Sequence, residues 1–393
     1  MIGSTQKTQS MRLSTLIPFI SMSVMVACTG IMNTAPPQQA RTESTTPAPV
    51  TNSPALSRPS RYVIADAHLH YVDFLQQTDG IQKILAAMDS AGVDHAMISG
   101  MPLVKKWEEA DSKRPSYYLS DDSRVYWYSA TDMIVARAVT QLPGHQRSRF
   151  HPFITGVNAA DKNAVNHIEL MMESYPDLWE GIGELFGHHD DLTALTYGEV
   201  PRPNTQAMQR LFEFAGQHDL PVSLHTNITS VWEKKDPLWL EEFETALKRN
   251  RNTRFIWCHA GISRRLVVPD LTGILGTLLT RYPNLWIDLS WVVYDDYVAP
   301  LNTLGDKRIV NENWLALMKD FPDRFMIGSD AVGHMDRYVE TVRRYDALLD
   351  AMEPATARKI AHDNFLSVLP KRAGITPARS GPASDNSHRT PQP

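Results

Sequence analysis

The sequence predicts an α/β protein with one central domain, a (β/α)8 TIM barrel. Short apolar runs of strand length alternate with stretches of helix length between residues 61 and 372, an alternation typical of a parallel sheet covered by helices. Several of these runs end in a histidine or a carboxylic acid, and the carboxyl ends of barrel strands all open on one face. A segment of about 310 residues is also long enough for one barrel with insertions.

Eight strands and the helices between them can be placed along this segment. The helix expected at 204–219 repeats apolar residues at helical spacing and can begin with Asn204 or Thr205 as N-cap. Further helices are expected at 239–249, 270–281, 335–352 and 355–369. The strands are expected at 62–67, 93–98, 151–157, 180–184, 221–225, 254–259, 285–289 and 325–329.

The connection between the second and third strands, residues 99–150, is a long insertion that includes a helix-like stretch at 130–141. The βα loops of a barrel cover the active site, so this insertion can be a lid or a wall for the substrate. The alternative is a satellite hydrophobic cluster that serves stability. Its aromatic residues include Trp107, Tyr117, Tyr118, Tyr126, Trp127 and Tyr128.

Residues 1–28 resemble an export signal. Two basic residues precede an apolar run at 16–27, which is shorter than the about 20 residues of a membrane span. The run ends in Met25-Val26-Ala27-Cys28, which resembles a bacterial lipoprotein box, where the cysteine is acylated. We therefore expect an exported protein, held in the cell envelope by an N-terminal lipid, with simple secretion into the periplasm as the alternative.

Both ends outside the barrel have the composition of disordered segments. Residues 29–60 are rich in Pro, Thr and Ser and predict a tether, and residues 373–393 predict a disordered tail. The net charge of −5 and the pI of about 6.3 provide no basic surface for nucleic acid. Cys258 is the only cysteine in the predicted barrel, and alternation along a strand is expected to turn it outward if His259 faces the interior.

Six residues at strand ends have the chemistry of a metal site. His68 and His70 stand two apart after the first strand, so both imidazoles are expected on one face. Imidazole nitrogens and carboxylate oxygens together suit Zn²⁺ and related divalent ions. The later strands end in Glu184, His225, His259 and Asp330.

With these residues the chain resembles the amidohydrolase superfamily, and in particular its amidohydrolase 2 branch. The resemblance covers roughly residues 62 to 370 and includes His259-Ala260-Gly261 and the stretch from Ile360 to Phe365. It implies one or two divalent ions, with zinc expected first, held by the residues at the strand ends. Many superfamily members carry a carboxylated lysine on strand four, where this chain has Glu184, so the number of ions stays open.

The residue types suggest roles within such a site. Asp330 can be both a ligand and the group that accepts a proton from water activated by the metal, while His259 can ligate a second ion or stabilise an oxyanion. Asp66 can support the ligands from behind. Candidate substrate contacts are Asn227, Arg264, Trp291 and Tyr294, and His188 and His189 can extend the site.

Three functions follow. The leading hypothesis is a metal-dependent hydrolase of a small amide, ester or lactone. The second is a non-oxidative decarboxylase of an aromatic or unsaturated carboxylate, since some proteins of the same branch split C–C bonds with a similar site. The third is an exported barrel that binds metal without catalysis. A free coordination position and an acid–base residue, Asp330, favour an enzyme.

Overall fold

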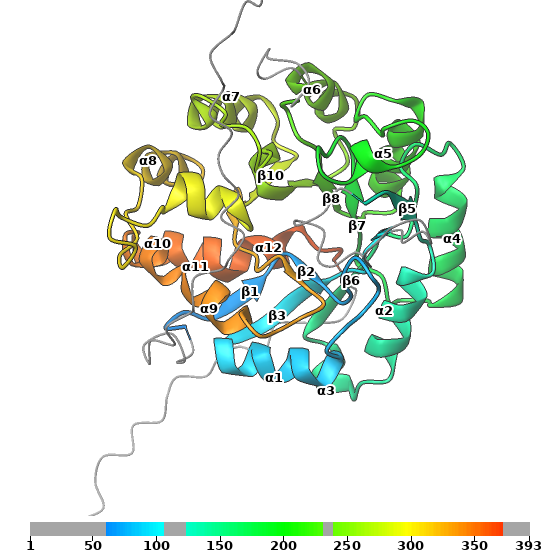
Figure 1. Cartoon of the computed structure of the whole chain (residues 1–393), viewed down its shortest axis with the longest axis horizontal. Helices are drawn as coiled ribbons and strands as arrows, with labels where there is room; N and C mark the ends of the chain where they lie inside the picture. The colour runs from blue at the N-terminus through cyan, green and yellow to red at the C-terminus, as the bar shows by residue number, and fades with distance from the viewer. Residues whose placement is uncertain (1–59, 106–122, 231–238, 372–393) are drawn as a thin grey trace, which may run out of the picture. The chain divides into compact units, whose positions relative to one another are not determined.

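The computed structural model describes residues 60–105, 123–230 and 239–371 and confirms the predicted barrel (Figure 1). Eight parallel strands lie side by side in the order β1-β3-β6-β7-β8-β9-β10-β11. The ring closes where the Ala67 amide donates to the Ile327 carbonyl at 3.0 Å. The strands are β1 (Ile64–Asp66), β3 (Val93–Ile98), β6 (Phe150–Ile154), β7 (Gly181–Phe186), β8 (Val222–His225), β9 (Phe255–Trp257), β10 (Leu285–Asp288) and β11 (Phe325–Met326).

Helices surround the sheet, as the sequence predicts (Figure 1). The helix that follows β7 begins with Thr205, whose hydroxyl accepts a hydrogen bond from the Met208 amide, so Thr205 rather than Asn204 is the N-cap. The outer helices are α1 (Ile81–Ala91), α2 (Thr131–Thr140), α3 (Gly144–Arg147), α4 (Ala164–Ser174), α5 (Gln206–Gln217), α6 (Leu240–Arg249), α7 (Leu271–Arg281) and α8 (Glu312–Asp320).

The helices that follow β11 are shorter and more interrupted than predicted. Instead of one helix over 335–352 there are two, α9 (Tyr338–Arg343) and α10 (Asp346–Asp350). The predicted helix at 355–369 begins as α11 (Pro354–Arg358), passes through a π-helical turn (Lys359–Asp363) and ends as α12 (Asn364–Val368).

The inside of the barrel is filled with apolar side chains and closed by α12 at the amino ends of the strands. Phe365 and Val368 of α12 belong to the same buried cluster as interior residues of the strands. The opposite, carboxyl end carries the six residues of the predicted metal site, so α12 leaves the site face free. The strand residues of this cluster are Ala65, Met97, Phe153, Ile256 and Met326.

Two short pairs of strands extend the carboxyl face. β2 (Leu69–His70) pairs in parallel with β12 (Ala331–Val332), which joins the segment after β1 to the segment after β11. β4 (Leu103–Lys105) and β5 (Val125–Trp127) form an antiparallel pair within the long insertion. The described part of this insertion contributes Leu103 and Val125 to the hydrophobic core, while Met101 lines the central cavity, so it supplies both core packing and part of the cavity wall.

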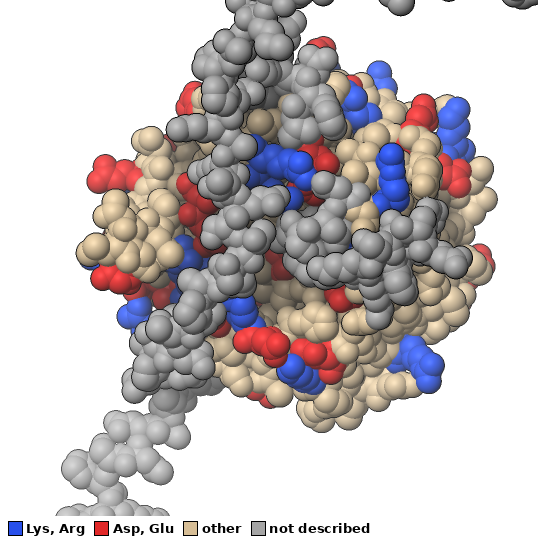
Figure 2. Space-filling model, in the orientation of Figure 1, with Lys and Arg blue, Asp and Glu red and all other residues tan. Residues whose placement is uncertain are grey.

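The predicted signal segment, most of the tether and the tail lie outside the described residues, as do Trp107, Tyr117 and Tyr118. No helix within the described ranges is long and apolar enough to cross a membrane. On the face shown in Figure 2, basic and acidic side chains of the described residues are interspersed rather than gathered by sign.

Candidate metal centre

Four histidines at the carboxyl ends of the strands are anchored in the same way, through Nδ1. Carbonyl and carboxylate oxygens only accept hydrogen bonds, so each Nδ1 carries the proton and each Nε2 keeps its lone pair. The anchoring pairs are His68 with Asp288 Oδ2 at 2.8 Å, His70 with the Gly100 carbonyl at 2.8 Å, His225 with Glu184 Oε1 at 2.8 Å, and His259 with the Ser290 carbonyl at 3.1 Å.

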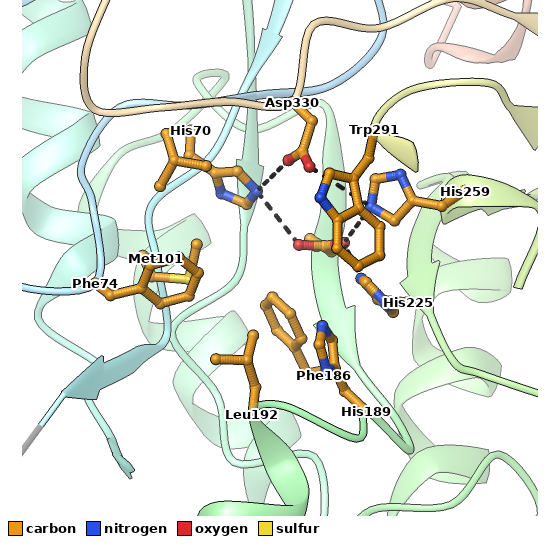
Figure 3. A pocket seen from close by; sticks show the side chains of 12 residues that line it. His70, Phe74, Met101, Phe186, His189, Leu192, His225, His259, Trp291 and Asp330 are labelled. Atoms are coloured by element: carbon orange, nitrogen blue, oxygen red, sulfur yellow. Dashed lines mark hydrogen bonds and ion pairs between the residues drawn. The ribbon is translucent and has the colours of Figure 1, made fainter. Parts of the chain in front are cut away.

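The Nε2 atoms of three of these histidines, His68, His70 and His259, lie close to the same carboxylates, and Figure 3 shows His70 and His259 directed toward Asp330. Nε2 of His68 lies 3.2 Å from Nε2 of His70, and Nε2 of His70 lies 3.3 Å from Glu184 Oε2. Asp330 Oδ1 is 3.5 Å from His68 Nε2 and 3.7 Å from His70 Nε2. Ligands of a tetrahedral zinc are roughly 3.3 Å apart, so this set of lone pairs has the spacing that a cation requires.

His259 joins the same group from β9. Its Nε2 lies 3.7 Å from Glu184 Oε1 and 3.9 Å from Asp330 Oδ2. Two overlapping sets therefore have donor atoms within 4.8 Å of one another, His68 with His70 and Asp330, and His68 with Glu184 and His259. The donor chemistry fits a divalent metal ion.

The electrostatics of the centre attract positive charge. Burial lowers the pKa of His68, but the carboxylates of Glu184 and Asp330 outweigh it and raise this pKa well above its ordinary value. Burial alone would raise the pKa of Glu184, yet His68 and His225 hold it well below its usual range. A metal ion at this point would replace the proton that His68 otherwise attracts.

His225 is placed differently from the other predicted ligands. Its Nδ1 hydrogen-bonds Glu184, and it belongs to neither of the two tight donor sets. Its ring packs against His259 with centroids 4.8 Å apart. In this geometry His225 orients Glu184, and its predicted role as a ligand stays a prediction.

Asp288 and Ser290 were not predicted, although they tie two of the histidines together. Ser290 Oγ donates to Asp288 Oδ2 at 2.6 Å and lies 2.9 Å from His259 Nδ1. Asp288, completely buried, accepts the His68 Nδ1 proton at 2.8 Å. The available signal was the end of the seventh strand, where these two residues stand two apart as His68 and His70 do.

Asp66 supports the centre through the backbone rather than the imidazoles. Its Oδ1 accepts from the amides of His68 at 3.1 Å and Ser329 at 2.8 Å, and its Oδ2 accepts from the Tyr338 hydroxyl at 2.9 Å. It thus joins the segments that carry His68 and Asp330, in agreement with its predicted supporting position.

Cys258 corrects the sequence prediction. Its thiol faces the barrel interior, 3.1 Å from Ser223 Oγ and within 4.8 Å of donor atoms of His68 and Asp288. β9 ends at Trp257, and His259 and Ala260 adopt positive φ of 55° and 51°, so strand alternation no longer applies. Burial raises the pKa of the thiol, which keeps it neutral.

Three residues of the centre have left-handed backbones that non-glycine residues seldom adopt. They are His259 (φ 55°), Trp291 (φ 60°) and Asp330 (φ 49°). Such conformations cost about 1–3 kcal/mol each and are concentrated at functional sites. Gly261 enables the first turn, because a Cβ there would lie 1.8 Å from the Trp257 ring.

A cavity of about 20 Å³ opens over the centre, and polar and apolar side chains contribute equally to its walls (Figure 3). This volume is enough for one water molecule. The polar part consists of His70, Glu184, His189, His225, His259 and Asp330, and the apolar part of Phe74, Met101, Phe186, Leu192, Trp291 and Val332.

Only some of the predicted substrate contacts reach this cavity. Trp291 lines it, with its ring centroid 5.1 Å from that of His259, and so does His189. Asn227 lies behind His225 and donates to the Ile262 carbonyl at 2.7 Å. Arg264 is paired with Asp191 at 2.8 Å and is not among the lining residues.

Tyr294 does not fit its predicted role. It is completely buried away from the cavity, and its hydroxyl donates to the Arg344 carbonyl at 2.6 Å. The segment after β10 turns into a π-helix (Tyr294–Val298), which points Tyr294 into the protein. His188 is also outside the cavity wall and packs against Trp239, with ring centroids 5.6 Å apart.

Comparison with known proteins gives a family match over most of the chain. A family model described as Amidohydrolase, from the amidohydrolase 2 group, matches residues 65–370. No curated protein matches the sequence at a significant level.

Solved structures resemble the chain at low identity. A probable 2-pyrone-4,6-dicarboxylic acid hydrolase from Acinetobacter baumannii is 13% identical with a TM-score of 0.49, and the match covers 78% of this chain and 98% of that one. A 2,6-dihydroxybenzoate decarboxylase from Rhizobium is 12% identical, with a TM-score of 0.46 and coverages of 78% and 98%. A dihydroxybenzoic acid decarboxylase from Polaromonas sp. JS666, with bound manganese, is 11% identical, with a TM-score of 0.46 and coverages of 78% and 96%.

Proposed function

We propose that this chain, which belongs to the amidohydrolase family, is a metal-dependent hydrolase of a small molecule. The family uses a divalent metal ion. The observation that carries the proposal is the common anchoring of three histidines, His68, His70 and His259, through Nδ1, which directs their Nε2 atoms to the carboxylates of Glu184 and Asp330. A barrel that only binds metal has no need for an acid–base residue such as Asp330 that faces a cavity beside the metal ligands.

His68, His70 and Asp330 are the proposed principal ligands, with Glu184 beside them. Nitrogen and oxygen donors in this proportion suit Zn²⁺ first and tolerate Mn²⁺. When bound, the ion would supply Lewis-acid activation to a substrate oxygen or to water.

The remaining roles belong to the side chains that face the cavity. Asp330 has 15% of its side-chain surface exposed, whereas the Glu184 side chain has 3%, so Asp330 is the carboxylate that can exchange a proton with a substrate. His259 is fixed by Ser290 and adjoins Trp291. We assign to His259 the ligation of a second ion beside Glu184, because its Nε2 presents a lone pair and has no proton to donate to an oxyanion.

The residues that line the cavity indicate which class of substrate it would accept. Apolar and aromatic side chains form half of the lining, and no lysine or arginine of the described residues is part of it. An apolar or aromatic body is therefore expected, with the polar reacting group directed at the metal centre. Under the leading hypothesis, the bond that is hydrolysed belongs to an amide, an ester or a lactone.

The aromatic wall also favours a second candidate, the non-oxidative decarboxylation of an aromatic carboxylate. An aromatic ring at the mouth of the cavity, against Phe186 or Trp291, would direct its carboxylate toward the same ligands. Both reactions need the same metal ligands and differ in what leaves the substrate.

One experiment separates these reactions. Zinc- or manganese-loaded enzyme is incubated in oxygen-18-labelled water with esters, amides and lactones that have aromatic bodies, and with hydroxylated aromatic carboxylates. Hydrolysis puts labelled oxygen into the product, whereas decarboxylation releases carbon dioxide and leaves the ring unlabelled. Asp330→Asn is the inactive variant, and His334→Gln is the control on a neighbouring loop. Metal-loaded protein without turnover on the whole panel would favour the non-catalytic hypothesis.

A further inference from the structure

A second group of histidines and carboxylates lies at the other end of the barrel, at the amino ends of the strands. Its members come from the start of β3 and β6, from the residue before β7, and from the π-helical turn that precedes α12. None of them contributes to the centre described above. We call this group the base cluster, which consists of Asp94, His95, His151, Glu180, His362 and Asp363.

A hydrogen-bonded chain fixes the tautomer of His95. Glu180 Oε2 accepts from His151 Nδ1 at 2.8 Å, so His151 Nε2 has a lone pair and accepts from His95 Nδ1 at 3.0 Å. The nitrogen of His95 that is left for another partner is therefore Nε2, with its lone pair.

His362 is oriented by a carboxylate in the same manner. Its Nδ1 donates to Asp363 Oδ1 at 2.7 Å, and its Nε2 lies 3.2 Å from Asp94 Oδ2. A neutral imidazole would bring a lone pair against this carboxylate, so a positive charge has to lie between them. Asp94 Oδ1 in addition has no hydrogen-bond partner among the described residues.

We propose that Asp94, His95 and His362 form a second divalent-cation site that binds Zn²⁺. Their donor atoms lie within 4.8 Å of one another, and tetrahedral zinc brings its ligands to roughly 3.3 Å. The adjustment is small, because all three side chains are partly exposed. Partial exposure also gives the ion access and leaves a position for water.

The second-site ion would connect β3 to the segment that closes the base of the barrel. His151 with Glu180, and Asp363, hold the two imidazoles in the tautomers that ligation needs. The alternative to a metal ion is a second proton on His362, which would be donated to Asp94. The two alternatives differ in the number of zinc ions that the protein binds.

The test counts zinc bound by the full chain. Metal-stripped protein is dialysed against buffered micromolar Zn²⁺ at pH 7.5, and bound metal is measured by elemental analysis. The His68→Gln/His70→Gln double variant lacks two proposed ligands of the metal centre at the carboxyl ends of the strands. We expect it to retain one equivalent of zinc, bound at the second site. His362→Gln in this background should lose that equivalent, and Asp94→Asn should lower the affinity for it at least tenfold.

His334→Gln is the matched control. His334 also lies between two carboxylates, Asp73 and Asp79, at 3.3 Å each, but it is in none of the groups of described residues whose donor atoms are close enough to share a metal ion. It should leave the stoichiometry unchanged. Circular dichroism establishes that each variant is folded, and Asp94→Asn replaces His362→Gln if the latter does not fold. The second site is refuted if His362→Gln or Asp94→Asn leaves the zinc stoichiometry of the His68→Gln/His70→Gln protein unchanged, or if that protein binds no zinc. A proton on His362 would then be the positive charge beside Asp94.

Discussion

Replacing Asp288 with asparagine tests whether the buried carboxylate behind His68 determines the affinity of the metal centre. Asp288 Oδ2 accepts from His68 Nδ1 at 2.8 Å and from Ser290 Oγ at 2.6 Å, while Oδ1 accepts from the Ser290 amide at 2.9 Å. All three partners are donors. An asparagine must turn its own NH₂ donor toward one side or the other, so at least one buried donor loses its acceptor.

The size of the effect follows from this geometry. A hydrogen bond to a charged group contributes about 1.5–3 kcal/mol, and loss of a partner behind a metal ligand typically costs 10–100-fold in affinity. Burial would raise the pKa of Asp288, but the hydrogen bond from His68 outweighs it and keeps the pKa below its ordinary value, so the carboxylate is ionised in the wild type. We expect Asp288→Asn to bind Zn²⁺ about 10–100-fold more weakly, and Ser290→Ala to show a smaller loss because the His68–Asp288 contact remains.

The assay is a competition between the protein and a chromophoric chelator for Zn²⁺ at pH 7.5, with the fold followed by circular dichroism. Asp295→Asn is the control, because Asp295 follows the same strand but is paired with Arg344 at 2.7 Å, away from the metal centre. The reasoning is refuted if folded Asp288→Asn binds zinc within threefold of the wild type, or if Asp295→Asn weakens binding as much.

Three further predictions concern catalysis, pH and location. Asp330→Asn should keep the fold and most of the metal but lower turnover at matched metal occupancy by about 10²–10⁴-fold; more than about a tenth of wild-type turnover would exclude Asp330 as the proton-transfer group. Burial, with help from Arg202 and His225, lowers the pKa of His188 to about 4. The folded state therefore binds fewer protons than the unfolded state between pH 6.5 and 4, so this group's stabilisation is complete above pH 6.5 and is lost as the pH falls toward 4. His188→Gln should reduce the acid-induced decrease in Tm over that range by the equivalent of up to about 3 kcal/mol, and an unchanged pH profile would contradict the assignment. Cys28→Ser should release the protein from the membrane fraction of a bacterial host if Cys28 is lipidated; wild-type protein found wholly in the soluble periplasmic fraction would instead indicate simple secretion.

The barrel and most of the metal centre could be predicted because both depend on local sequence. Each strand is a short apolar run, and its last residue must lie on the carboxyl face of a parallel barrel. His68, His70 and Asp330 could therefore be found without knowing which strands are neighbours. The same rule, applied to the end of β10, would also have found Asp288 and Ser290.

The errors arose where tertiary contacts override local pattern. The prediction for Cys258 failed because it assumed that His259 continues the strand, whereas β9 ends at Trp257 and His259 turns back through a left-handed conformation. Tyr294 turned inward because a π-helical turn follows β10. The base cluster was also beyond prediction, since His362 and Asp94 are 268 residues apart and no spacing relates them.

The contacts of Asp66 have a consequence for the order of events during synthesis. Two of its partners, the Ser329 amide and the Tyr338 hydroxyl, are 263 and 272 residues further along the chain. At the usual rate of translation the ribosome needs roughly 15–50 s to produce them after Asp66. Until then the first strand has no closing neighbour, and burial of its carboxylate would be unfavourable. The nascent chain therefore remains open to chaperones and to any export machinery for nearly the whole of its synthesis.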